Sequence, residues 1–144
     1  MMLEKIRSFV RNKNVCVLST VSDNKPYCSL MAYITDDICK EIYMVTHKNT
    51  TKFNNLQKNP LVSLLIDSRE TQPRSNAQAL TVEGVFIPLA DENKKQKIRD
   101  RMLKSFPHMK DFIHHPESEF IRIKINSFLL LEGLTESHFI SLSS

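Results

Sequence analysis

The sequence predicts a mainly β fold with helices (α+β), in which helices cover the ends of an antiparallel barrel. Three observations favour this class. The chain holds six to eight short apolar segments of strand length, and most of them are joined by local turns. Helical periodicity is confined to the N-terminus and to the stretches after the third and fifth strands. A parallel α/β sheet would instead need a helix between successive strands.

The N-terminal elements are a helix and three strands. Residues 2–13 carry apolar side chains at helical spacing, which predicts an amphipathic helix. Residues 15–21 and 27–35 are predicted to pair as an antiparallel hairpin, because Ser, Asp, Asn and Pro between them are turn residues. Residues 41–46 form the third predicted strand.

A short helix and a fourth strand come next. Asn49 or Thr50 can cap the helix, and the Asn59-Pro60 pair ends it, since proline disfavours the helical conformation of the residue before it. Residues 61–67 form a continuous apolar run, which predicts a strand buried on both faces.

The second half of the chain is predicted as follows. Residues 68–76 are polar and read as an exposed loop, and the fifth strand spans residues 78–88. Asp91 caps a longer helix that runs to Lys104. A broken helical segment follows over residues 106–115, and its predicted inward-facing residues are Met109, Phe112 and Ile113.

The C-terminal part is predicted as three strands. Alternation from Glu119 places Ile121, Ile123 and Ile125 on one face. Two further strands are predicted over residues 128–131 and 139–142. With 144 residues, the chain is expected to be a single domain over 1–144.

Composition excludes several classes. The charge of +4 favours nucleic-acid binding only weakly, and the basic segment around Lys94–Lys104 is interpreted as a solvated helix face, so no nucleic-acid partner is expected. The chain shows no secretory leader and no apolar run of membrane-spanning length. Cys16, Cys28 and Cys39 form no CxxC pair and are expected to be buried thiols. A cytoplasmic protein without a membrane partner is therefore expected.

Motifs for catalysis and metal binding are lacking. Only two glycines are present, so neither a GxGxxG turn nor a GxxxxGK loop exists. His114 and His115 are adjacent rather than at a metal-ligating helical spacing, and no metal site is predicted. No nucleophile–base–acid order stands out, so catalytic residues stay unassigned.

One anion site is predicted from the residues themselves. Thr46, Thr50, Thr51 and Lys52 cluster where the third strand gives way to the second helix. A helix N-terminus exposes unpaired N–H groups and the positive end of the helix dipole. Hydroxyl donors and an ammonium group at that point favour a phosphate.

Three segments carry a family resemblance: KPYCSLMAYI (25–34), VTHKNTTKFNNLQKNPLVSLLI (45–66) and ALTVEGVF (79–86). They resemble, in the same order, the FMN-binding split barrels related to pyridoxamine 5'-phosphate oxidase. The resemblance covers nearly the whole chain and implies a split antiparallel β-barrel of the FMN-binding type.

The resemblance also implies a cofactor site. In such proteins the FMN phosphate is held by residues that correspond to Thr46, Thr51 and Lys52. The flavin ring lies against the second strand, and a second subunit completes the site, which implies a homodimer with FMN at the interface. The residues implied along the second strand and at the remaining positions are Ser29, Leu30, Met31, Ala32, Val45 and Gln78.

Departures from the named oxidase limit what is carried over. That oxidase has an arginine where this chain has Thr51, and its strand-opening glutamine aligns with Ala79, one place after Gln78. The chain also lacks tryptophan and the basic C-terminal segment. The expected function is therefore an FMN-dependent oxidoreductase of unassigned small-molecule substrate, not that oxidase. The alternatives are a non-catalytic flavin carrier, storage protein or redox sensor, and a barrel that binds haem or a deazaflavin.

Overall fold

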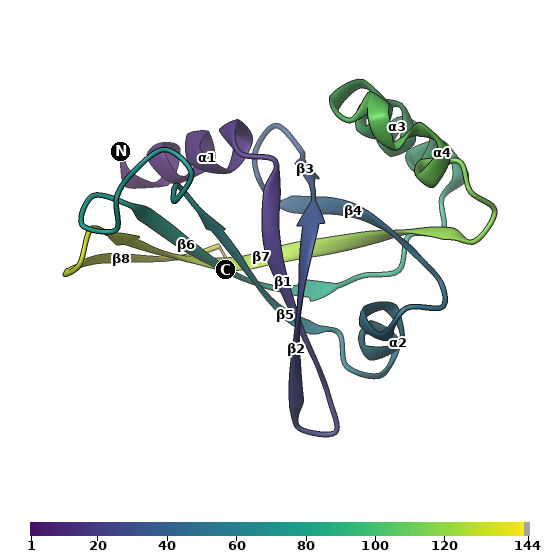
Figure 1. The fold of residues 1–144 in the computed structure, drawn as a ribbon, viewed down its shortest axis with the longest axis horizontal. Coiled ribbons are helices and arrows are strands. Elements are labelled where there is room, and N and C mark those ends of the chain that lie inside the picture. The colour runs from purple at the N-terminus through teal and green to yellow at the C-terminus, as the bar shows by residue number, and fades with distance from the viewer. Residues whose placement is uncertain (143–144) are drawn as a thin grey trace.

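The computed structural model describes residues 1–142, which form an antiparallel sheet curled into a half-barrel with four α-helices (Figure 1). The strand order is β2-β1-β5-β6-β7-β4-β3, and β8 pairs with β7 beside this path. The elements are α1 (Met2–Asn12), β1 (Val15–Ser22), β2 (Lys25–Ala32), β3 (Ile34–Thr35), β4 (Glu41–His47), α2 (Thr51–Lys58), β5 (Leu61–Asp67), β6 (Gln78–Phe86), α3 (Glu92–Ser105), the 3-10 helix η1 (Pro107–Met109), α4 (Lys110–Ile113), β7 (Ser118–Glu132) and β8 (Glu136–Ser141).

The two ends of the sheet are joined by one segment of chain. β2 pairs with β1 and β3 pairs with β4, and only Tyr33 separates β2 from β3. The Tyr33 N–H donates to the Asn14 carbonyl oxygen at 3.0 Å, and its buried hydroxyl donates to the Val10 carbonyl oxygen at 2.6 Å. These bonds fix the point where the strand leaves one neighbour and joins the other.

β7 is one strand of 15 residues, so the prediction of a break before residue 128 was wrong. β4 pairs with its first half and β8 with its second half, while β6 pairs along residues 123–132. A register shift between Glu83 and Gly84 of β6 lets this pairing continue through the bend.

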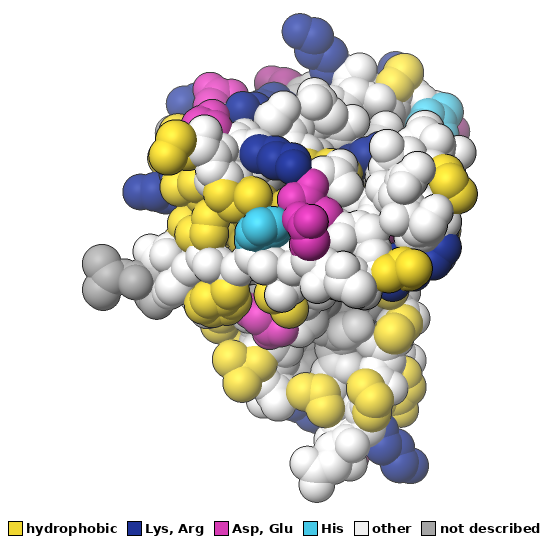
Figure 2. Space-filling model, turned by 90° about the vertical axis from the view of Figure 1, so that its left-hand side faces the viewer, with side chains coloured by type: hydrophobic (Ala, Val, Ile, Leu, Met, Phe, Trp, Pro, Cys, Tyr) yellow, Lys and Arg dark blue, Asp and Glu magenta, His cyan; other side chains and the backbone are white. Residues whose placement is uncertain are grey.

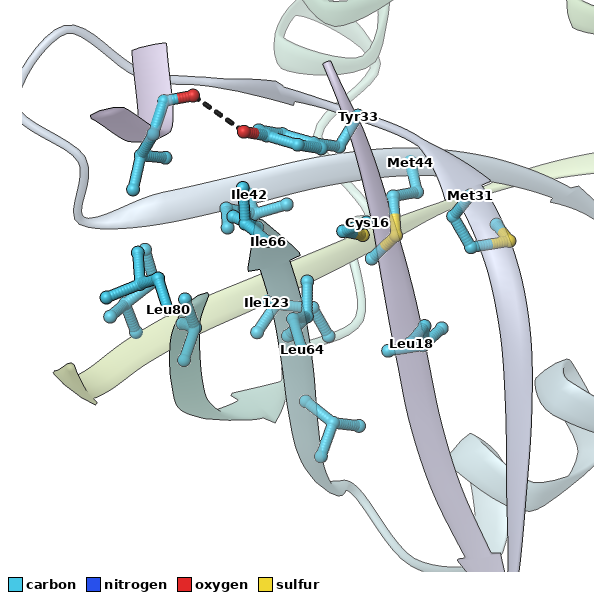
Figure 3. Packing of buried hydrophobic residues seen from close by; sticks show 14 of the residues in the cluster. Cys16, Leu18, Met31, Tyr33, Ile42, Met44, Leu64, Ile66, Leu80 and Ile123 are labelled. Atoms are coloured by element: carbon cyan, nitrogen blue, oxygen red, sulfur yellow. Dashed lines mark hydrogen bonds between the residues drawn. The ribbon is translucent and has the colours of Figure 1, made fainter. Parts of the chain in front are cut away.

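The core has two parts. Inside the half-barrel, residues from β1, β2, β4, β5, β6 and β7 interdigitate, and Figure 3 shows Cys16, Met31 and Met44 gathered there. On the other side of β4, Tyr43 and Val45 pack under α3 against Ile98 and Met102. Successive β4 side chains therefore serve different cores, as strand alternation requires.

Three burial predictions were wrong. β5 is buried on one face only, because its odd-numbered residues lie on the outer face of the curled sheet. Phe112 is 37% exposed rather than inward-facing, and Cys28 is exposed on the same outer face of β2. None of the helices within residues 1–142 combines the length and apolar character that a membrane crossing requires.

Candidate functional site

The N-terminus of α2 lies directly after β4, as the sequence predicted. Thr50 caps the helix: its Oγ1 accepts a hydrogen bond from the Phe53 N–H at 3.3 Å. Thr46 Oγ1 lies 3.2 Å from Thr50 Oγ1. Because Thr46 is only 2% exposed, its hydroxyl supports the cap from inside rather than facing solvent.

The first turn of α2 offers a donor-rich surface. Thr51 is exposed, Lys52 is half-buried, and the turn contains no acidic residue. The N–H groups of Thr51 and Lys52 lie in the first turn of the helix, where no helical carbonyl group is placed to accept their hydrogen bonds. An anion would meet a hydroxyl, an ammonium group and free N–H groups at this point.

The β2 residues predicted to flank a flavin ring lie on an edge strand. Within residues 1–142, β2 is the end of the sheet and has β1 as its only full-length partner. Its outer N–H and C=O groups are therefore available to a ligand or to another chain. Leu30 is 76% exposed and borders a cavity of about 300 Å³ whose apolar wall includes Val15, Val17 and Leu65. Met31 faces the opposite way into the core, and Ser29 and Ala32 are half-buried.

Two further predicted residues lie apart from the α2 turn. Val45 is buried on the α3 side of β4. Gln78 pairs with Glu132 at one end of β7, whereas Thr46 pairs with Glu119 at the other end. Thirteen steps along β7 separate these pairs, about 40 Å of strand at the usual rise. A single chain does not bring Gln78 to the α2 turn.

His47 ends β4 and is half-buried against the segment around α4. Its ring stacks on Phe112 with centroids 4.5 Å apart and lies 4.6 Å from the ring of His115. Its Nε2 atom is buried and has no hydrogen-bond partner within the described chain. Sequence reasoning missed this cluster because Phe112 of α4 and His115, which follows α4, come to β4 from more than 60 positions away.

An apolar row crosses the outer face of the sheet. Strand pairing places its members side by side, in the order Leu30, Val17, Leu65, Thr81, Leu129 and Phe139. Phe139 is 65% exposed. Figure 2 shows several separate groups of exposed hydrophobic side chains on one side of the molecule. Thr81 is the one polar member of the row. Exposed apolar residues that lie side by side are typical of a surface that another protein covers.

A second group that the sequence did not indicate lies on the β7–β8 hairpin. One ligand atom each from Glu132, Glu136 and His138 falls within 4.8 Å of the others. Lys5 of α1 already pairs with Glu132 at 2.5 Å. The Lys5 ammonium group is the first cause of the lowered pKa of Glu132. The Lys5–Glu132 ion pair thus links α1 to the hairpin.

Comparisons with known proteins extend these findings. The family model for pyridoxamine 5'-phosphate oxidase matches residues 2–131, whereas no curated protein matches the chain. A heme binding protein from Mycobacterium smegmatis superposes with a TM-score of 0.84 at 17% identity, over 98% of this chain and 58% of that one. General Stress Protein 26 from Bacillus anthracis str. Sterne superposes with a TM-score of 0.72 at 22% identity, over 98% of both chains. An FAD-binding protein from Mesorhizobium loti superposes with a TM-score of 0.73 at 20% identity, over 88% of this chain and 91% of that one.

Identities this low establish a shared fold alone, and the predicted split antiparallel barrel is confirmed. The family model spans nearly the whole sequence and includes β2, the α2 turn and β6. This chain therefore belongs to the pyridoxamine 5'-phosphate oxidase family.

Proposed function

We propose that this protein binds FMN as a homodimer and acts as an FMN-dependent oxidoreductase of a small molecule. The observation that carries the proposal is the acid-free first turn of α2, where Thr51 and Lys52 sit beside free N–H groups. This donor set fits a phosphate. Family membership and the FAD-binding neighbour from Mesorhizobium loti support a flavin as the molecule that carries it.

Each part of the chain would have a defined task. Lys52 would neutralise the phosphate, Thr51 would donate a hydrogen bond to it, and the Thr46–Thr50 hydroxyl pair would hold the cap in place. The outer edge of β2 around Leu30 would present backbone groups to the ring. FMN itself would supply the hydride and electron chemistry. The residues then need only bind the ring and shield it from water.

The homodimer has its own support. The apolar row on the outer face continues to Leu30, so a second copy that covers the row would also close the cavity beside β2. Gln78 opens β6 beside the end of β7 that is distant from Thr46, so it does not reach the α2 turn of its own chain. Any contact of Gln78 with this flavin would have to come from the partner copy.

The test is FMN titration monitored by quenching of flavin fluorescence. Wild-type protein is expected to quench it saturably, and Lys52→Gln should weaken binding at least about tenfold, because charge-assisted hydrogen bonds contribute roughly 1.5–3 kcal/mol. Lys58→Gln is the matched control, with the same charge change at the other end of α2. Equal affinities of the Lys52 variant and the wild type would refute the phosphate assignment.

Turnover decides between an enzyme and a flavin carrier. An oxidoreductase with bound FMN should consume reduced nicotinamide when an electron acceptor is supplied. A carrier, storage protein or sensor would bind the flavin and show no such consumption. A shifted visible spectrum of the purified protein would reveal a deazaflavin in place of FMN.

Haem is a second candidate because of the His47 cluster. The buried Nε2 of His47 has no hydrogen-bond partner within residues 1–142, and an imidazole nitrogen in that state is a ready iron ligand. The Mycobacterium smegmatis neighbour is a heme binding protein. A Soret band upon hemin addition that His47→Ala abolishes would favour haem. Flavin quenching without such a band favours FMN.

A further inference from the structure

A second cavity lies between α3, α4 and the start of β7. Its volume is about 370 Å³, and its apolar floor is formed by Val45, Ile113 and Phe120. Arg99, His114 and His115 line its walls. This volume lies within the range of small-molecule sites, which typically combine an apolar lining with a few polar groups.

This cavity is separate from the α2 turn. Val45 and Thr46 are neighbours on β4, so their side chains point to opposite faces of the strand. Val45 belongs to the core under α3, whereas Thr46 contacts Thr50 at the start of α2. A ligand in the cavity and a phosphate at α2 would therefore occupy different sides of β4.

The charges around the cavity have one sign. None of the residues that line it is Asp or Glu. Arg99 forms no ion pair within residues 1–142, although Lys94 and Lys95 of the same helix both pair with carboxylates. The Arg99 guanidinium lies 5.4 Å from the Phe120 ring centroid and donates to Gln96 Oε1 at 2.6 Å. The other N–H groups of the Arg99 guanidinium are left to donate to a ligand.

A histidine adds a second donor. The Glu117 N–H donates to His115 Nδ1 at 3.0 Å. Since that nitrogen accepts a hydrogen bond, the ring proton of neutral His115 resides on Nε2. His115 is thereby fixed as a donor at Nε2. Like Arg99, it can donate a hydrogen bond to an anion.

We propose that this cavity binds a small organic carboxylate, with Arg99 holding the carboxylate group and the apolar floor covering the rest of the molecule. Arginine matches a carboxylate in bidentate fashion. The apolar floor gives a reason for a hydrocarbon body, which an inorganic anion lacks. The proposal does not depend on the flavin, because the two sites use different residues on different faces of β4.

Calorimetric titration of FMN-saturated protein tests the proposal with three probes: benzoate, acetate and inorganic phosphate. Benzoate is expected to bind saturably and more tightly than acetate or phosphate. Arg99→Gln should weaken benzoate binding at least tenfold, and Arg99→Lys should give an intermediate loss. Lys97→Gln is the matched control, since Lys97 is exposed on the same helix and does not line the cavity. Circular dichroism and thermal melting verify that each variant is folded.

The outcomes separate this proposal from the flavin site. Lys52→Gln should leave benzoate affinity unchanged, and Arg99→Gln should leave FMN affinity unchanged. Absence of benzoate binding at millimolar concentration would overturn the proposal, as would equal affinities of Arg99→Gln and Lys97→Gln. Phosphate binding as tightly as benzoate would overturn the carboxylate assignment.

Discussion

At the scale of single residues, Tyr33 lies between β2 and β3, and its buried hydroxyl ties this point of the chain to α1. Burial raises the pKa of its phenol, so the group stays a neutral donor to the Val10 carbonyl oxygen. Tyr33→Phe leaves that carbonyl at the end of α1 without this partner. We expect a loss of about 1–2 kcal/mol in the free energy of unfolding, the usual cost of an unmade buried hydrogen bond.

Urea denaturation followed by circular dichroism measures this loss. Tyr27→Phe is the matched control, because Tyr27 lies on the same segment of chain and is 41% exposed. The control should unfold at the wild-type urea concentration. A Tyr33→Phe midpoint equal to that of the control would show that the hydroxyl contributes nothing.

Residue-scale predictions from the sequence succeeded where local chemistry decides and failed where distant packing does. The Thr50 cap was predictable, because a hydroxyl before a helix serves the N–H three residues on. The environment of His47 was not, because Phe112 covers it from a distant helix. Cys28 looked like a buried strand thiol, but it lies on the face of β2 that the chain leaves uncovered.

At the scale of elements, Gly84 allows β6 to follow the bend of β7. A Cβ at this position would lie 2.6 Å from Ile123 Cγ2 and 2.7 Å from the Lys124 carbonyl oxygen. The backbone oxygen cannot move without breaking the strand pairing, so Gly84→Ala should lower stability by about 1–3 kcal/mol. Differential scanning calorimetry tests this, with Glu83→Ala on the exposed face as the control. A melting temperature unchanged by Gly84→Ala would contradict the close packing.

The contact of α3 with β4 is expected to depend on pH through Glu41. Burial alone would raise the pKa of its carboxyl, but hydrogen bonds from Tyr43 and Lys94 outweigh burial and lower that pKa. A carboxyl with a lowered pKa in the folded state stabilises the protein above its unfolded pKa. This contribution is lost as the pH falls through the lower, folded pKa.

Urea denaturation should therefore show that the wild type is less stable at acid pH than at pH 7. The loss of stability should be smaller for Glu41→Gln, which lacks this carboxyl. The expected difference is at most about 1 kcal/mol, because solvent screens the partly exposed Lys94–Glu41 pair. Glu92→Gln provides the comparison, since the Glu92 side chain is 82% exposed and pairs with Lys95 of the same helix, α3. Identical pH profiles for wild type and Glu41→Gln would rule out this contribution.

Element types were largely predictable, whereas pairing was not. Caps and turns set the ends of α2 and α3, and the Asp23-Asn24 turn adopts the positive φ values that a two-residue hairpin requires. The apolar run in β5 suggested burial on both faces. The sequence alone does not show that the chain leaves one of these faces uncovered. β7 was predicted in two parts, because the sequence does not show that the strand continues past Asn126, which the register shift leaves without a paired residue in β6.

At the scale of the whole molecule, the apolar row is a set of hydrophobic residues on a face that this chain does not bury. Val17 and Leu65 pair in the middle of the row, and Leu30 and Phe139 end it on β2 and β8. A monomer would leave these residues in water at a cost of about 25 cal/mol for each Å² of apolar surface. In the proposed homodimer, a second copy of the chain would remove that cost.

The proposed homodimer predicts opposite outcomes for two substitutions on the β7–β8 hairpin. Phe139 and Leu134 are 65% and 63% exposed, but only Phe139 belongs to the row. Phe139→Glu would place a charge within the interface, so light scattering is expected to show a shift from dimer to monomer. Leu134→Glu adds the same charge in the turn and should stay dimeric. Phe139 is not among the predicted flavin residues, but FMN affinity should fall with the loss of the dimer, because the partner copy of the proposed dimer would close the site beside Leu30. A monomeric wild type, or a Phe139→Glu variant that dimerises and binds FMN like Leu134→Glu, would show that the row is not the surface that assembles the site.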